Sequence, residues 1–199
     1  YVGLSTGASV VIAQYYGAHN KGKIHQAVHT SYMLAIVSGI IMMLFGLFFS
    51  YQCLDAIGVP HDILNDASLY MKLYFLGMIP GAIYNIGSGI LRAVGDSKRP
   101  LYYLIICSII NVVFDFVFVV ILHKGIAGAA IATFIAQTVC AILVTLQLIF
   151  SKDVYQLTLS KIKFHLPVLK KIVKIGAPAG IQSTMYSIAN IVLQTHINS

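Results

Sequence analysis

Six apolar runs, most of them about 20 residues long, follow one another along this chain between short polar breaks. They cover residues 2–16, 28–51, 67–91, 101–122, 126–150 and 172–199. A helix of about 20 residues crosses a hydrocarbon core of about 30 Å. With 58% hydrophobic and only 10% charged residues, the 199 residues carry more apolar surface than a soluble fold could bury. The sequence therefore predicts an all-α, polytopic membrane protein with six transmembrane segments and the lipid bilayer as its solvent.

The basic residues are distributed unevenly between the loops that join these runs. Eleven of the 13 Lys and Arg residues lie in the first, third and fifth loops, which leaves Lys72 and Lys124 for the opposite side. Loops rich in Lys and Arg normally stay in the cytoplasm. The net charge of +7 therefore indicates topology, and because the cations line no single helix face we expect no nucleic acid partner.

Residues 151–171 form the one candidate linker, since the chain turns polar and basic there for about 20 residues. We expect this segment on the cytoplasmic face. Two conformations remain open for it: an amphipathic helix attracted to anionic lipid, or a plain solvated loop.

Asp115 is the only acidic residue inside an apolar run. A carboxylate at the centre of a bilayer costs about 2.5–3.5 kcal/mol, so it normally faces protein or a water-filled cavity. Asn111 precedes it by one turn on the same helix face. Thr133 follows in the next run and is expected at a similar depth, because a very short hairpin around Gly125 joins the two helices.

Three interpretations of this group of oxygens are open. Carboxylate, amide and hydroxyl oxygens at one level can bind a hard cation such as sodium. Alternatively, burial favours the neutral carboxyl, so that Asp115 would bind and release a proton. A structural hydrogen bond between helices, worth roughly 0.6–2 kcal/mol, is the third. Because ionisable residues within membranes are functional by default, we predict an ion site at Asp115, Asn111 and Thr133.

Polar and helix-bending residues on the other runs give weaker predictions. Asn85, Ser88 and Gln137 are polar positions on apolar helices, and we expect them in the wall of a substrate cleft. Pro80 and Pro178 each remove a backbone donor inside a run, so both are predicted kinks or hinges.

Two of the seven histidines, His25 and His29, have a spacing of four residues that could suit a metal site. They flank a basic loop at the membrane edge and have no acid nearby. We therefore expect both to be solvated at the interface instead of binding a metal.

Four motifs, taken in order, resemble the multidrug and toxic compound extrusion family. They are VIAQYYGA at 11–18, ILRAVGDSKRP at 90–100, NVVFD at 111–115 with GIAGAAIAT at 125–133, and IGAPAGIQ at 175–182. The resemblance extends over essentially the whole chain. It implies that the six runs correspond to helices two to seven of a twelve-helix transporter built from two six-helix bundles.

The same resemblance implies a division of the chain and a mechanism. Residues 1–150 would form the first bundle without its first helix, 151–171 the cytoplasmic linker, and 172–199 the truncated start of the second bundle. Several bacterial and archaeal members bind their coupling ion with an Asp and an Asn on helix five and a Thr on helix six, which match Asp115, Asn111 and Thr133. The implied function is export of amphipathic or cationic drugs in exchange for sodium or protons, by a monomer in the bacterial inner membrane.

Two other functions compete with drug export. A flippase for lipid-linked sugars or peptidoglycan precursors would need several cations in its cavity to hold pyrophosphate, and no run has a central Lys or Arg. A membrane-embedded lipid-processing enzyme would need clustered carboxylates or an HExxH motif, and one membrane Asp is too few. We therefore expect a transporter that is not an enzyme, with no cofactor apart from its coupling ion.

Overall fold

The computed structural model describes residues 2–197, and every regular element within that range is helical. The elements are α1 (Val2–Gly17), α2 (Lys21–Ala56), α3 (His61–Leu76), α4 (Met78–Ala93), α5 (Lys98–Asp115), the π-helix η1 (Phe116–Ile121), α6 (Gly125–Phe150), the 3₁₀ turn η2 (Leu159–Lys161) and α7 (Leu166–Ile197). The two last residues of the predicted sixth run, 198–199, and residue 1 lie outside the described range.

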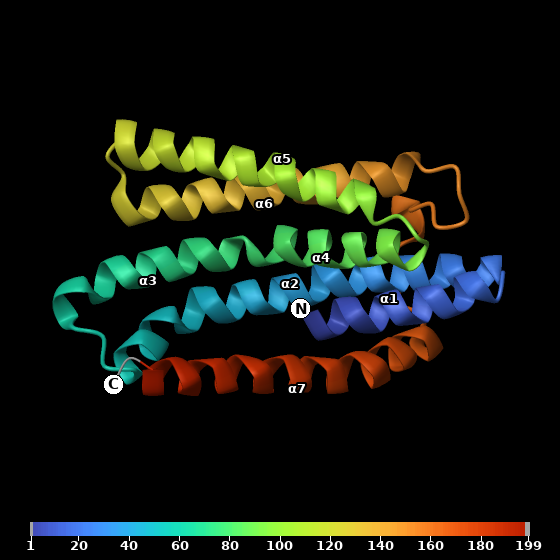
Figure 1. Ribbon diagram of the computed structural model, residues 1–199, viewed down its shortest axis with the longest axis horizontal. Coiled ribbons are helices and arrows are strands. Elements are labelled where there is room, and N and C mark those ends of the chain that lie inside the picture. Colours follow the sequence, from blue (N-terminus) through green and yellow to red (C-terminus); the bar gives the residue numbers. More distant parts are fainter. Residues whose placement is uncertain (1, 198–199) are drawn as a thin grey trace.

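The long helices run side by side along one axis, with α3 and α4 in one line and η1 continuing α5 (Figure 1). Four stretches of the described chain are long and apolar enough to cross a membrane: Lys21–Ala56, His61–Ala93, Lys98–Ile121 and Gly125–Phe150. They correspond to the second to fifth predicted segments, and only Leu122 of these segments lies outside them. The predicted all-α, multi-pass membrane fold is confirmed, with α1 and α7 packed alongside these four.

Several helices extend beyond the apolar runs that predicted them. α2 begins at Lys21 and not at residue 28, α3 at His61 and not at 67, and α7 at Leu166 and not at 172. Hydropathy marks only the part of a helix inside the hydrocarbon, whereas capping sets where the helix begins. At the start of α2, for example, the Asn20 side chain accepts a hydrogen bond of 3.1 Å from the Lys23 backbone N–H.

The two prolines predicted to bend helices differ in their effect. α3 and α4 together form one long rod, called the third rod here, which is interrupted at Gly77. There the Gly77 N–H donates to the Tyr74 carbonyl at 3.0 Å. The ring of Pro80 opposes the carbonyl of Leu76 and offers it no N–H, which accounts for the interruption. Pro178, by contrast, lies inside α7, which continues through it.

The basic loops gather at one end of the molecule. In Figure 1 the connections at 18–20, 94–97 and 151–165 lie at the same end, and those at 57–60 and 122–124 lie at the other. We call the first the basic end. The alternation of charge along the sequence therefore corresponds to a real separation in space.

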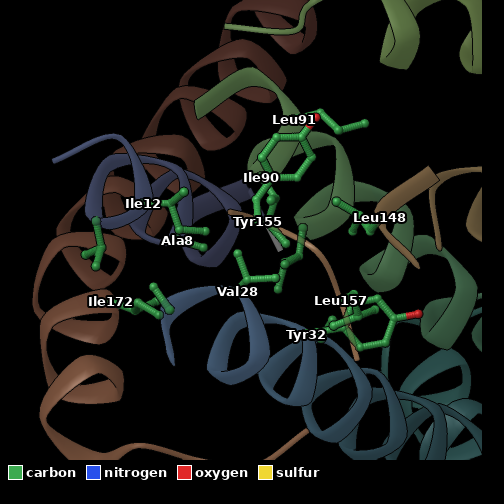
Figure 2. Close-up of a cluster of buried hydrophobic side chains, with 14 of the residues drawn as sticks. Ala8, Ile12, Val28, Tyr32, Ile90, Leu91, Leu148, Tyr155, Leu157 and Ile172 are labelled. Atoms are coloured by element: carbon green, nitrogen blue, oxygen red, sulfur yellow. The ribbon is translucent and has the colours of Figure 1, made fainter. Parts of the chain in front are cut away.

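Most of the buried apolar core lies toward the basic end, and the linker is part of it. Figure 2 shows Tyr155 and Leu157 among side chains from α1, α2, α4, α6 and α7. Leu157 is 1% exposed and Tyr155 5%. Leu157 also donates its backbone N–H to the Leu148 carbonyl at 2.9 Å.

This packing corrects two predictions. Between residues 152 and 165 the linker is not a plain solvated loop, since Tyr155 and Leu157 are buried, and it is not an amphipathic helix, since η2 is its only regular element there. Leu159 remains exposed, and residues 166–171 of the predicted linker belong to α7. His29, expected to be solvated, is fully buried. Its ring contacts the backbone of Thr158, so the linker covers the face of α2 that the sequence alone left open to water.

Candidate functional site

The hairpin formed by α5, η1 and α6 brings two of the predicted ion-site residues into contact. Its connection is only three residues long, and Gly125 begins α6 with a φ of +54°, a conformation that suits glycine. Across the hairpin, the Asn111 Nδ2 donates a hydrogen bond of 3.4 Å to the Thr133 Oγ1. Asn111 is thus the residue level with Thr133.

Asp115 lies one turn beyond Asn111, about 6 Å further along α5 toward the hairpin connection. The side chain is half-buried. One carboxylate oxygen, Oδ1, is fully buried and has no hydrogen-bond partner among residues 2–197. A buried acceptor without a donor costs about 1–3 kcal/mol. Such an oxygen is suited to a bound cation or to a proton of its own.

The helix changes its winding immediately after Asp115. From Phe116 to Ile121 the chain is a π-helix, and the Leu122 N–H donates to the Val117 carbonyl, five residues back, at 2.9 Å. Isolated π turns inside helices occur frequently at functional sites. The sequence alone does not signal this π-helix, because the run FVFVVI differs little from an ordinary apolar helix.

A cavity of about 290 Å³ extends from the Asn111–Thr133 pair between α4, α5 and α6. Asn85 and Gln137, both predicted for a cleft wall, line it. Ser88 does not line this cavity and is buried on α4, at 1% exposure. The polar residues of its wall are Tyr84, Asn85, Ser108, Asn111, Thr133 and Gln137.

Two glycines of the third rod make room for the Gln137 amide. A Cβ atom at Gly77 would lie 2.6 Å from the Gln137 Oε1, and one at Gly81 would lie 3.3 Å from it. The Gly81 carbonyl also accepts a hydrogen bond of 2.8 Å from the Asn85 Nδ2. The absence of side chains at Gly77 and Gly81 therefore leaves the space in which the Gln137 amide lies.

Pro80 lies on a second, apolar surface. It lines a groove of about 580 Å³ between α2, the third rod and α6, together with Ile79, Ile83 and Phe134. The third rod thus presents an apolar groove on one side and the polar cavity on another.

The wall of the polar cavity provides neutral oxygen and amide groups, and Asp115 adds a negative charge one turn away. Oxygen atoms of these types are the ligands that hard cations prefer. The arrangement is therefore suited to binding a small cation reversibly.

Replacing Thr133 by Val should lower the free energy of unfolding by about 0.6–2 kcal/mol, because Val keeps the shape and loses the hydroxyl that Asn111 contacts. Unfolding of the full-length protein in mixed micelles would measure the change. Thr138→Val is the matched control, since its hydroxyl donates to the Phe134 carbonyl of its own helix at 2.7 Å. An equal loss in both variants would show that the bond between helices contributes nothing.

Comparison with known proteins gives a consistent result. The family model MatE matches residues 1–117. The chain is 28% identical over 206 aligned residues to the "Probable multidrug resistance protein YoeA" of Bacillus subtilis (strain 168), covering 99% of this chain and 44% of that protein.

Solved structures agree with this match. A multidrug resistance MATE family transporter of the MOP superfamily in an outward-facing conformation superposes with a TM-score of 0.88 and 27% identity, over 98% of this chain and 43% of the other. An inward-facing conformation of such a transporter gives a TM-score of 0.82 and 28% identity, over 89% of this chain and 40% of the other. The chain thus spans less than half the length of the proteins it matches.

Proposed function

This chain belongs to the MatE family, and from that premise we propose that the full-length protein is a secondary active multidrug exporter. It exchanges amphipathic or cationic drugs for an inward flow of sodium or protons. Residues 1–150 belong to the first helical bundle, 151–171 to the linker, and 172–199 begin the second bundle. The protein acts as a monomer in the bacterial inner membrane with its basic end in the cytoplasm.

One observation carries this proposal: the buried, unpartnered Oδ1 of Asp115 next to the Asn111–Thr133 pair. A structural Asp would be expected to use both oxygens in hydrogen bonds, since leaving one unpaired is unfavourable. An oxygen that binds and releases an ion must instead lack a permanent partner. Asp115 is therefore the coupling residue, and Asn111 and Thr133 supply further oxygen atoms or hydrogen bonds.

Coupling requires that the ion and the drug prefer different states of the protein. A ligand that binds two states with equal affinity does not change the equilibrium between them, however tightly it binds. In the outward-facing state an ion from outside binds at Asp115 as the drug leaves, and the ion-loaded protein then returns to the inward-facing state and releases the ion into the cytoplasm.

The experiment is an export assay with the full-length protein in cells that lack their own efflux pumps. Ethidium and a fluoroquinolone serve as substrates, with a sodium gradient or a proton gradient imposed separately. Export should follow one of the two gradients and stop when that gradient is dissipated. Ethidium and fluoroquinolone efflux at the rate of cells without the protein, under both gradients, would refute the proposal.

A further inference from the structure

A second polar cavity lies at the basic end, about 560 Å³ in volume, between the beginning of α2 and the linker. α2 contributes His25 and Gln26 to its wall. The linker contributes Ser160, Lys161, Lys163 and His165. The cavity is separate from the Asp115 site, with which it shares no lining residue.

The linker wall of this cavity is fastened to α2 at two points. At the first, the His29 Nδ1 lies 2.7 Å from the His25 carbonyl, and the Thr158 N–H donates to the His29 Nε2 at 3.0 Å. Because a carbonyl can only accept, the short contact to His25 assigns a proton to Nδ1, and Nε2 accepts from the Thr158 N–H. The His29 Nε2 also lies 3.2 Å from the Thr158 carbonyl oxygen, and the ring is tilted against that of His25 with 4.0 Å between ring centroids.

At the second point, Thr30 binds His165 twice. The His165 backbone N–H donates to the Thr30 Oγ1 at 3.1 Å, and the Thr30 hydroxyl lies 3.2 Å from the His165 Nδ1. With that hydroxyl donating to Nδ1, a neutral His165 carries its proton on Nε2. The Nε2–H group of His165, which lines the cavity, is therefore a donor that takes no part in the contacts with Thr30.

The charged side chains that line the cavity are all positive. Lys161 and Lys163 are positive, and within the described chain the wall contains no carboxylate. Gly22, in the first turn of α2, also lines the cavity. The backbone N–H groups at the start of a helix add a partial positive charge at that position.

We propose that this cavity binds a phosphate-type anion. Two ammonium groups, imidazole N–H groups, a serine hydroxyl and the Gln26 amide are the donors that phosphate oxygens prefer. The anion would bridge α2 and the linker, strengthening the fastenings at His29 and Thr30. Its source is either the headgroup of an anionic lipid, since the cavity lies where the basic loops gather, or a soluble phosphate.

Equilibrium dialysis of the full-length protein tests the proposal, with radiolabelled inorganic phosphate at constant ionic strength in a non-ionic detergent. One saturable site is expected. Lys161→Gln combined with Lys163→Gln should weaken binding about tenfold, because two charge-assisted contacts are lost at an exposed position. The matched control, Lys152→Gln with Lys174→Gln, removes the same charge from exposed positions outside the cavity and should change binding less than about twofold.

A second arm separates the two sources. Native mass spectrometry would compare retention of phosphatidylglycerol and phosphatidylcholine by the delipidated protein and by both variant pairs. Preferential retention of phosphatidylglycerol, lost only in the Lys161 and Lys163 pair, assigns the site to a lipid headgroup, and saturable phosphate binding without that preference assigns it to a soluble ligand. Neither ligand binding saturably, or equal weakening in both pairs, overturns the proposal. Export is not used as a readout, so the outcome is independent of the proposed function.

Discussion

Replacing Asp115 by Asn should reduce gradient-driven drug export by about tenfold or more while the protein remains folded in the membrane. The substitution keeps the shape of the side chain and removes both the charge and the site of protonation. Each tenfold loss corresponds to about 1.4 kcal/mol of the preference that the ion gives to one conformational state. Ethidium efflux under an imposed sodium or proton gradient, normalised to the amount of protein in the membrane, measures the effect.

Asp55→Asn provides the matched control for this prediction. Asp55 is exposed near the end of α2, so the same chemical change there should leave export within about twofold of the unmodified protein. Asp115→Asn with unchanged efflux and unchanged dependence on both gradients would remove the assigned coupling role. A loss of membrane-inserted protein would be read separately, from the yield of folded protein in detergent.

Replacing Gly7 by Leu should separate α7 from α1 and lower export at least about tenfold. The two helices are in backbone contact: a Cβ atom at Gly7 would meet the Ile172 carbonyl and lie 2.9 Å from the Gly176 Cα. At the next turn, a Cβ at Gly3 would lie 2.6 Å from the Gly180 Cα. Small residues allow such close approach in membranes, where van der Waals contact between helices is a main source of their association.

Gly17→Leu is the control on the same helix, because nothing lies within 4 Å of a Cβ atom there. Export should fall at least about tenfold for Gly7→Leu and by less than about twofold for Gly17→Leu. Cysteine cross-linking between α1 and α7 would report the distance between them independently of transport. If Gly7→Leu exports normally and cross-links normally, the close contact is not needed for function.

That Asn111, Asp115 and Thr133 lie near one another could be predicted, because their proximity depends on local geometry. Asn111 and Thr133 are 22 positions apart on helices joined by a three-residue connection, so the hairpin fixes their relative depth. The level of Asp115 was less well predicted, since Asn111 and not Asp115 faces the threonine hydroxyl. The interruption near Pro80 likewise follows from a single residue that cannot donate a backbone hydrogen bond.

The position of the linker could not be predicted from local pattern. His29 and Thr158 are 129 positions apart, and Thr30 and His165 are 135 apart, so no periodicity within either segment signals the contact. In the sequence, Tyr155 and Leu157 look like ordinary residues of a polar loop. Only the packing of five helices around them shows that they belong to the core. The contact of α1 with α7 was missed for the same reason, although glycines four residues apart are present in both.

The buried linker also determines where the bundle can bend. Tyr155 and Leu157 are buried among five helices. The junction between α6 and α7 is therefore held in place by packing and is not a flexible linker. α7 is 32 residues long, or about 48 Å, so a swing of about 10° around that junction displaces its far tip by about 8 Å. Small rearrangements beside this junction would therefore produce larger displacements at the opposite end of the molecule. Opening the basic end would first require breaking the hydrogen bonds of His29 and Thr30 with the linker.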